Sequence, residues 1–188
     1  MDNPEGSLTE KEKYIVEGCL LGDATMRKKT NSLIEINHSF KQKVLVDRLY
    51  FVLKRFVSTP PKLRKGNGGR FAYRFTTRSL ESFNQFYVRF YGEGKKKIPN
   101  DLQLTPVSLA YWLMDDGGKS YKAIYLNTQQ FDLVDQNLLL NKLEGLGIKA
   151  FLNKDKIYQR IRVSVSSIAK VKEMVWPYIL PEFRYKLP

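Results

Sequence analysis

The sequence predicts an α+β protein made of two similar halves, each with the element order αββαββα. Segments in which apolar residues recur at helical spacing alternate with pairs of short segments in which apolar and polar residues alternate. This order occurs twice, with a repeat of roughly ninety residues. The 188 residues, of which 43% are apolar, suffice for one compact body or for two small halves that share an interface. We place the halves at residues 1–100 and 101–188.

The first half begins with a helix, because Thr9 and Glu12 form a capping-box pattern ahead of apolar residues at helical spacing. A strand pair follows, in which Ile34 and Ile36 alternate with polar residues. The next helix ends at a run that contains two prolines, and the second strand pair has Gly-Asn-Gly-Gly as its turn at 66–69. The expected ranges, from first helix to last, are 9–22, 24–37, 45–56, 66–76 and 80–92.

The second half begins at Thr105 and Pro106, an N-cap residue followed by proline at the first helical position. This helix is expected to end at Asp116, ahead of two glycines. The later elements repeat the order of the first half, and Gly147 and Pro177 mark the ends of the two later helices. The expected ranges, from first helix to last, are 105–116, 120–128, 139–147, 148–165 and 168–176.

The charge of the chain points to a polyanionic partner. There are 32 Lys and Arg against 19 Asp and Glu, a formal charge of +13, on a composition that favours a folded protein. Such a surplus is typical of a nucleic-acid binder. A single cysteine, Cys19, and a single histidine, His38, exclude an internal disulfide framework and a Cys/His zinc site, so a catalytic metal must use oxygen ligands. Neither a membrane span nor a signal peptide is visible, and we expect no membrane partner.

Two aspartates, Asp23 and Asp116, stand at the end of the first helix of their halves. A helix C-terminus is negatively polarised, so a carboxylate there favours a compensating cation. Small residues at 18, 22 and 110 permit close packing of the two helices, which would bring the acids together. Two carboxylates with few nitrogen or sulfur ligands nearby suit Mg²⁺. The alternative is a pair of ordinary acids in surface turns.

Basic and aromatic residues are concentrated in the strand pairs. Between Thr59 and Leu80 there are six basic residues and no acid, and the last strand pair carries five basic residues against one acid. In the final strand, Tyr158, Arg160 and Arg162 share one face. Arginine can bind guanine and asparagine can bind adenine, although a solvated basic face is the alternative. The candidate nucleic-acid contacts are Arg27, Lys28, Asn37, Lys62, Arg64, Lys65, Arg70, Arg74, Lys119, Lys122, Tyr125, Asn127, Lys154, Tyr158, Arg160 and Arg162.

A lysine lies two residues before a proline near the end of each half. Lys97 in the string Lys-Ile-Pro matches Lys186 in the string Lys-Leu-Pro. These lysines, or Lys96 in the first half, would flank the acids and stabilise phosphoryl charge or orient a water molecule. Because lysine is common in this chain, an unrelated surface role is the alternative. His38 is a poor candidate for a general base, since its counterpart in the second half is Thr128.

Residues 109–117, Leu-Ala-Tyr-Trp-Leu-Met-Asp-Asp-Gly, resemble the nine-residue motif that names the LAGLIDADG homing endonucleases. Residues 16–24 are a looser copy, in which Ala24 replaces the last glycine. The resemblance covers nearly the whole chain after the first dozen residues, and 108–119 is its most specific part. Further strings resemble the monomeric, mitochondrial-intron-encoded branch of this family: residues 21–24, 98–100, 104–106, 126–129 and 185–188.

The resemblance implies a fold and a set of site residues. The two motif helices would form a central seam, and two saddle-shaped antiparallel sheets would lie in the major groove of DNA. Asp23 and Asp116 would be metal-binding catalytic acids, and Lys96 and Lys186 catalytic lysines. The internal repeat selects Lys97 instead of Lys96, so both stay candidates.

One further site residue, Gln129, corresponds in the resemblance to a polar residue that lines a water pocket. The first half offers His38 or Ser39 in the same role, which leaves that role open there. The implied activity is hydrolysis of one phosphodiester in each strand of a long, asymmetric double-stranded DNA site. A monomer would carry it out with two or three Mg²⁺ ions in a shared site.

The alternative function is a non-cleaving nucleic-acid binder on the same scaffold. It would be an intron maturase that binds intron RNA, or a transcription regulator. Both acids are retained, which favours cleavage, because a binder has no chemical need for two acids facing a polyanion. The compartment stays open between an organelle (mitochondrion or chloroplast) and the cytoplasm of a bacterium, including one that carries a phage.

Overall fold

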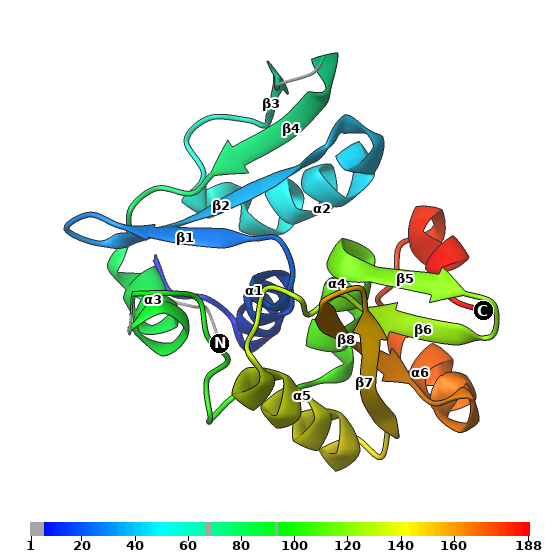
Figure 1. Ribbon diagram of the computed structural model, residues 1–188. Coiled ribbons are helices and arrows are strands. Elements are labelled where there is room, and N and C mark those ends of the chain that lie inside the picture. Colours follow the sequence, from blue (N-terminus) through cyan, green and yellow to red (C-terminus); the bar gives the residue numbers. More distant parts are fainter. Residues whose placement is uncertain (1–5, 67–68, 93) are drawn as a thin grey trace.

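The computed structural model describes residues 6–66, 69–92 and 94–188. In these ranges, a central pair of helices, α1 (Glu10–Leu21) and α4 (Pro106–Asp116), lies between two four-stranded antiparallel sheets (Figure 1). The element order αββαββα occurs twice, so the predicted fold class is confirmed. The boundary predicted after residue 100 falls in the irregular segment ahead of α4 and stays a prediction.

The first sheet lies over two helices of the first half. Its strands have the spatial order β1-β2-β4-β3. Helix α2 (Lys43–Leu53) packs on β2 and β4, and α3 (Asn84–Tyr91) packs on β1. Ile34 and Ile36 point to this helix-covered side and are almost fully buried. The strands are β1 (Thr25–Lys28), β2 (Ser32–Ser39), β3 (Lys62–Lys65) and β4 (Phe71–Thr76).

The second sheet repeats this arrangement with the spatial order β5-β6-β8-β7. Helix α5 (Leu133–Gly145) packs on β7 and β8, while α6 (Ile168–Val175) packs against α4. Ile124 and Leu126 on β6 are the buried counterparts of the two isoleucines on β2. The strands are β5 (Gly117–Ser120), β6 (Ala123–Leu126), β7 (Ala150–Asp155) and β8 (Tyr158–Val163).

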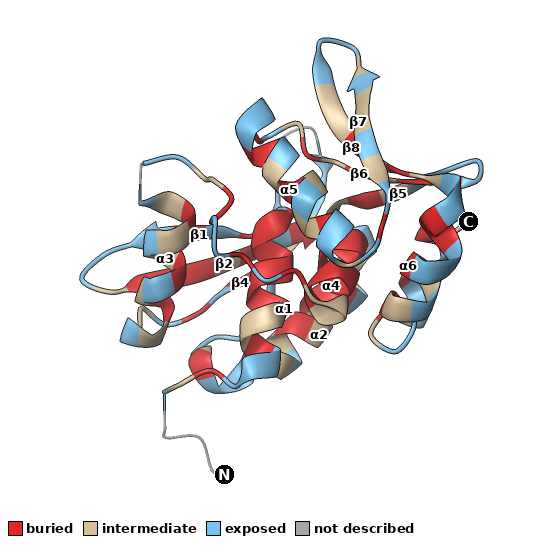
Figure 2. Cartoon of the chain, turned by 90° about the horizontal axis from the view of Figure 1, so that it is seen from below, coloured by how far each residue is buried: buried red, intermediate tan, exposed pale blue. Residues whose placement is uncertain are grey.

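The central helices begin at the predicted caps and meet backbone to backbone. The hydroxyl of Thr9 accepts a hydrogen bond from the backbone N of Glu12 at 3.2 Å, and the Glu12 carboxylate accepts from the backbone N of Thr9 at 2.7 Å. Both helices lie in the buried centre of the molecule (Figure 2). A Cβ atom at Gly18 would stand 2.5 Å from the carbonyl oxygen of Ser108. Only glycine therefore allows the helices to approach this closely.

Several predicted element limits need correction. Helix α5 begins at Leu133, ahead of the expected residue 139, and the second strand pair begins with β3 at Lys62, ahead of the expected residue 66. The third strand pair begins at Gly117 and its second strand ends at Leu126, instead of covering 120–128. This pair begins earlier than expected because Gly117 has an extended backbone (φ −81°, ψ 155°) that leads from α4 directly into β5. The 3₁₀-helix Pro181–Lys186, which carries Lys186, was not among the predicted elements.

Part of the predicted turn 66–69 lies outside the described residues, at 67–68. In the remainder of the chain, no helix is long and apolar enough to cross a membrane.

Candidate active site

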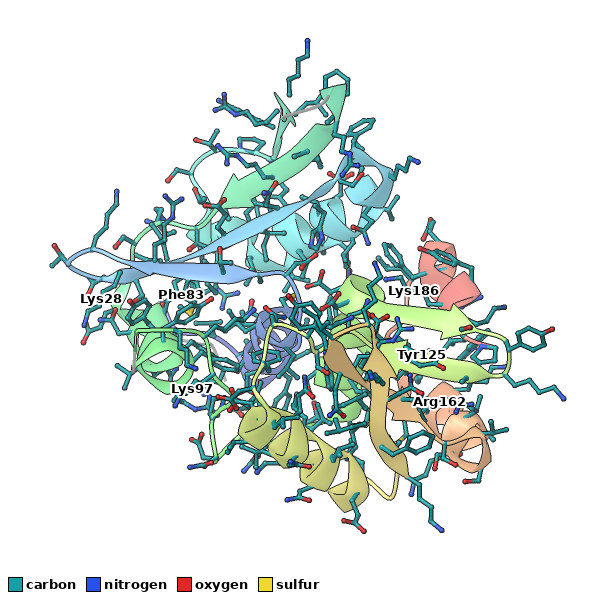
Figure 3. The ribbon with its side chains drawn as sticks, in the orientation of Figure 1. Lys28, Phe83, Lys97, Tyr125, Arg162 and Lys186 are labelled. Atoms are coloured by element: carbon teal, nitrogen blue, oxygen red, sulfur yellow. The ribbon has the colours of Figure 1, made fainter. Side chains whose placement is uncertain are left out.

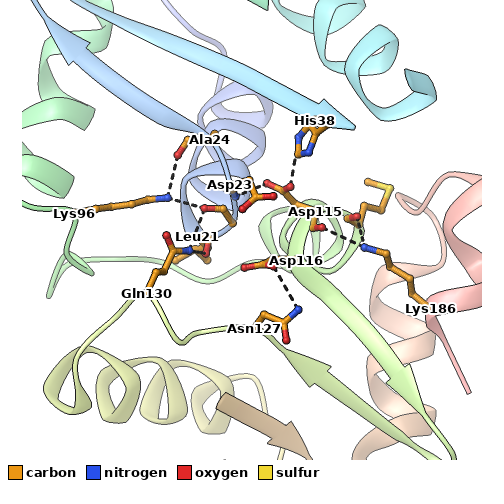
Figure 4. Close-up of polar contacts among 12 residues, drawn as sticks. Leu21, Asp23, Ala24, His38, Lys96, Asp115, Asp116, Asn127, Gln130 and Lys186 are labelled. Carbon is orange, nitrogen blue, oxygen red and sulfur yellow. Dashed lines mark hydrogen bonds and ion pairs between the residues drawn. The ribbon is translucent and has the colours of Figure 1, made fainter. Parts of the chain in front are cut away.

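Asp23 and Asp116 lie at the same end of the two central helices (Figure 4). Asp23 follows the C-cap residue Gly22 of α1 and is exposed, whereas Asp116 is the last residue of α4 and is partly buried. The amide of Asn127, just after β6, donates to Asp116 Oδ1 at 3.5 Å. The structure thus brings the two predicted acids together at the ends of α1 and α4.

Asp115, which the sequence analysis did not select, is a third acid in this cluster. Its Oδ2 accepts a hydrogen bond from the backbone N of Asp23 at 2.9 Å, across the seam between the two helices. Its Oδ1 lies 3.4 Å from Nε2 of His38, which comes from β2. A carboxylate oxygen or ring nitrogen from each of Asp23, His38 and Asp115 lies within 4.8 Å of the others.

Two lysines bind the C-terminal carbonyls of the central helices, one lysine from each half. Lys96 Nζ donates to the carbonyl oxygens of Gly22 at 2.6 Å and Ala24 at 2.9 Å, at the end of α1. Lys186 Nζ donates to those of Met114 at 2.6 Å and Asp115 at 3.2 Å, at the end of α4. The two contacts have the same form in the two halves, although Lys96 is one position away from the lysine that the internal repeat selects.

Lys97, the other candidate, lies beside the start of α5 (Figure 3). Its positive charge acts on Asp132 and Asp135, at the beginning of that helix. Its backbone N donates to the carbonyl oxygen of Phe90 at 2.8 Å. The structure therefore places the Lys96 side chain at the central helices and the Lys97 side chain near another group of acids.

The glutamine that approaches the central helices is Gln130, not Gln129. Gln130 Nε2 donates to the carbonyl oxygens of Gly22 at 3.2 Å and Leu21 at 3.4 Å. Gln129 Nε2 donates instead to Oδ2 of Asp155 at 2.9 Å, at the β7–β8 hairpin. The expected role of Gln129 stays a prediction, and Gln130 is a site residue that the sequence reasoning missed.

The protonation of these groups is shifted by burial. Burial, followed by the charge of Asp23, raises the pKa of Asp116 to about 6. The same two causes raise the pKa of Asp115 well above its usual range. Burial lowers the pKa of Lys96 to about 8 and also lowers that of Lys186, in both cases against the attraction of the acids. A group of buried acids with raised pKa values beside lysines with lowered pKa values is typical of a functional site.

The donor set at this end of the helices fits a hard divalent cation. Carboxylates of Asp23 and Asp116 meet here together with the partial negative charges of two helix C-termini. A cation would relieve the repulsion that raises the pKa of Asp116. Oxygen ligands are those that Mg²⁺ prefers. A pocket of about 520 Å³ opens beside Asp116 and is lined by Asp115, Asp116, Gly117, Gly118, Lys119, Asn127, Tyr185 and Lys186.

The two sheets turn polar faces away from their helices. In the first sheet, Glu35 on β2 stands between two arginines, with Arg27 Nη2 at 2.5 Å and Arg74 Nη1 at 3.6 Å. Arg27, Glu35 and Arg74 share a hollow of about 320 Å³ with Lys62 and Arg64. The predicted contacts on this face, by pairing register and alternation, are Arg27, Asn37, Lys62, Arg64 and Arg74.

In the second sheet, Tyr125 on β6 occupies the central place. The guanidinium carbons of Arg160 and Arg162 lie 4.3 and 5.9 Å from the centre of its ring, which are cation–π distances (Figure 3). Arg162 also lies 5.4 Å from the ring of Phe151. The predicted contacts on this face are Tyr125, Tyr158, Arg160 and Arg162.

Several predicted nucleic-acid contacts do not share these faces. Strand alternation turns Lys28, Lys65, Lys119 and Lys154 to the opposite side of their sheets. Lys28 Nζ, for example, lies 5.9 Å from the ring of Tyr87 on α3. The other exceptions lie outside the strands: Arg70 ahead of β4, Lys122 in the β5–β6 turn, and Asn127 at Asp116.

The family of the chain follows from this site together with a comparison of sequences. The sequence profile of the LAGLIDADG DNA endonuclease family matches residues 13–171, which contain both acids and both sheets. The chain belongs to this family.

Similar proteins support this assignment. "Cytochrome b mRNA maturase bI2" of Debaryomyces hansenii is 34% identical over 186 residues, which cover 90% of this chain and 71% of that protein. "Probable intron-encoded endonuclease 1" of Wickerhamomyces canadensis is 31% identical, over 96% and 85% of the two chains. The structure of the homing endonuclease I-WcaI, bound to its DNA recognition sequence, has a TM-score of 0.88 at 29% identity and covers 97% and 88%. I-DmoI in complex with DNA and Mn has the same fold, with a TM-score of 0.60 at 13% identity over 90% and 98%.

Asp115 and Gln130, which sequence reasoning missed, and His38, which it offered only for the water pocket, left different signals. Asp115 stands next to a predicted acid inside the LAGLIDADG motif, so its position was visible, but its contact with Asp23 is not local. His38 alternates with Ile34 and Ile36 on the inner side of β2, as Ser32 does at the start of the strand, and a buried ring that can ionise is unusual there. For Gln130, the sequence has two adjacent glutamines and does not decide which of them points to the central helices.

Proposed function

We propose that this LAGLIDADG protein is a site-specific homing endonuclease that cuts both strands of a long DNA duplex by Mg²⁺-dependent hydrolysis. The observation that carries the proposal is the meeting of Asp23 and Asp116 at the ends of α1 and α4, between two sheets with basic polar faces. I-WcaI, which covers nearly the whole chain, is described as bound to its DNA recognition sequence.

Asp23 and Asp116 would hold divalent cations, two or three in a shared site. When bound, these ions stabilise charge on the attacking and leaving oxygens of a phosphodiester. Burial and then the charge of Asp23 raise the pKa of Asp116 to about 6, and bound ions would compensate the repulsion between the two acids. At neutral pH the Asp116 carboxylate is therefore largely ionised and available as a ligand.

Lys96 and Lys186 would act on the phosphate. Each ammonium group has three N–H donors and gives two of them to carbonyl oxygens at a helix end. No third acceptor is present for either lysine among the described residues, so the remaining N–H would be available to a phosphate oxygen or to the attacking water. Because the carbonyls hold the ammonium groups in place, little reorganisation is needed when negative charge develops during hydrolysis.

The two sheets would bind the duplex on either side of the cut. Arginines on their polar faces are suited to phosphates and to guanine edges in the major groove. The faces differ, with Glu35 at the centre of one and Tyr125 at the centre of the other. Unlike faces read unlike half-sites, so we expect an asymmetric target. One chain carries both acids, and we therefore propose that it acts as a monomer.

A second candidate function is that of an intron maturase. It is favoured by the relative of Debaryomyces hansenii, whose name is that of a cytochrome b mRNA maturase. The same relative supports an intron of an organelle as the origin of the chain. Binding of intron RNA would use the basic surface and would need neither acid.

The decisive experiment is cleavage of a DNA library that contains candidate sites, with Mg²⁺ and with EDTA. Asp23→Asn and Asp116→Asn should each lower the cleavage rate by at least about 100-fold, because each removes a ligand of the shared ions. Asp47→Asn, an exposed acid on α2, is the matched control and should cut like the wild type. Equal cleavage rates of the wild type and the three variants, or cleavage in EDTA, would overturn the proposal. Splicing of an intron RNA by a protein that cuts no DNA would favour the maturase.

A further inference from the structure

The Asp115 side chain accepts a hydrogen bond across the seam between α1 and α4, and this bond holds the backbone at Asp23, a proposed catalytic acid. It belongs to α4, yet its Oδ2 accepts the backbone N–H of Asp23 at 2.9 Å, just beyond the end of α1. The space for this carboxylate exists because residue 22 is glycine, and a Cβ atom at that position would collide with the Asp115 carboxylate. Gly22 and Asp115 therefore fit together as a pair.

His38 lies beside the other oxygen of the same carboxylate. Its Nε2 is 3.4 Å from Asp115 Oδ1, a close contact outside hydrogen-bond geometry, and both side chains are only 1% exposed. His38 is placed on the inner side of β2, in line with Ile34 and Ile36, where a polar group without a partner would be unfavourable. The ring is thus positioned by the first sheet, and it meets a carboxylate from the second half of the chain.

This arrangement is one-sided. Counted from the two catalytic acids, the residue in the place of Asp115 in the first half is Gly22, which has no side chain to reach α4. The residue in the place of His38 in the second half is Thr128. It is fully buried, and within the described part of the chain its hydroxyl has no hydrogen-bond partner. The hydrogen bond of Asp115 thus acts on the backbone of Asp23. Gly22, the residue in the corresponding place, cannot make such a bond to Asp116.

We propose that His38 and Asp115 are positioning residues that fix the backbone of Asp23, so that cleavage of one DNA strand depends on them more than cleavage of the other. The proposal rests on the proposed endonuclease function for its catalytic consequence. The structural part, a held Asp23 N–H, is independent of that function.

The test compares cleavage of each strand with the exchange of one amide proton. Asp115→Ala and His38→Thr should slow cutting of one labelled strand about tenfold more than cutting of the other, so that nicked duplex accumulates. Asp115→Asn keeps an oxygen that accepts the Asp23 N–H, and it should restore the wild-type strand ratio. By NMR, the Asp23 amide should exchange faster in Asp115→Ala than in Asp115→Asn or the wild type.

The outcomes separate this inference from the proposed function. Thr128→Val, at the counterpart of His38, should leave the strand ratio unchanged. An equal loss on both strands in folded Asp115→Ala, or an Asp115→Asn protein as impaired as Asp115→Ala, would overturn the inference. If the wild type cuts no DNA, the endonuclease proposal fails, and the Asp23 exchange rates alone decide whether Asp115 positions this backbone.

Discussion

The two halves of the molecule share the lysine contacts at their helix ends and differ in their sheet faces. Lys96 binds the carbonyls that end α1, and Lys186 binds those that end α4. The sheets, by contrast, carry an acid between two arginines in the first half and a tyrosine beside two arginines in the second. The helix ends would each cut the same kind of bond, a phosphodiester, whereas the two sheets would contact different base pairs. Similar helix ends and different sheet faces are what duplication followed by divergence would leave.

The equivalence of the helix ends is tested most strongly by the lysines. Lys96→Met and Lys186→Met should each lower the single-turnover cleavage rate by about 100-fold, because a charged donor next to the phosphate is removed. Lys97→Met should change the rate only a few-fold, since the Lys97 charge acts on Asp132 and Asp135. A defect in Lys97→Met as large as that in Lys96→Met would show that the first half uses the other lysine.

The pH profile sharpens the same comparison. The pKa of Asp116 is raised to about 6, chiefly by burial, so below this pH a proton competes with the cation. The pKa of Lys96 is lowered to about 8 by burial, so above this pH its charge is lost. The cleavage rate should therefore rise about tenfold per pH unit below 6 and fall above 8.

Two changes should move the limbs of this profile in opposite directions. More Mg²⁺ should shift the acidic limb to lower pH, because binding of a cation releases the proton of Asp116. Lys96→Arg should shift the alkaline limb upward, because arginine keeps its charge. An acidic limb that does not respond to Mg²⁺ would argue against Asp116 as a ligand.

The helix seam breaks the symmetry at Gly18, whose counterpart in the second motif is Tyr111. A Cβ atom at Gly18 would stand 2.5 Å from the Ser108 carbonyl oxygen and 2.9 Å from Cβ of Tyr111. Gly18→Ala should destabilise the protein by about 1–3 kcal/mol, seen as a fall in Tm of several degrees in thermal unfolding. Gly118→Ala is the control, because a Cβ there meets nothing within 4 Å. Similar Tm values for the two variants would show that the helices can move apart at Gly18.

Local patterns predicted the elements well, because helix caps, apolar spacing and turn residues act over a few positions. They also placed Asp23 and Asp116, since each acid stands at a helix end that the sequence marks. The strand limits at Gly117 and Leu126 were less predictable, because glycine is compatible with both a turn and an extended strand.

The contacts around the acids are not local, and the sequence left them open. Asp115 and His38 are separated by 77 residues and meet only because the end of β2 lies beside the C-terminal end of α4 (Figure 4). The choice between Lys96 and Lys97 depends on which side chain points to the helix ends, which neither composition nor the internal repeat determines. The sheet faces were within reach, because strand alternation alone separates Arg27 from Lys28.

The smallest expected effects concern the sheet faces, where the two halves differ. Glu35→Gln would free Arg27 and Arg74 from their ion pairs, and binding to a random duplex should then strengthen and depend more steeply on salt, by about one phosphate contact. Tyr125→Leu should weaken binding about two- to five-fold, the value of an exposed cation–π contact. Fluorescence anisotropy over a salt series on target and random duplexes measures both effects.

For Glu35→Gln and Tyr125→Leu, the direction of the change in target and random affinity is more informative than its size. If Glu35 restrains its arginines for selectivity, Glu35→Gln should reduce the ratio of target to random affinity while raising the random affinity itself. Tyr125→Leu should lower both affinities, because the ring orders Arg160 and Arg162 without neutralising them. The same change in selectivity from both variants would mean that the two faces bind DNA in the same way, and the difference between the halves would then have no role in recognising an asymmetric site.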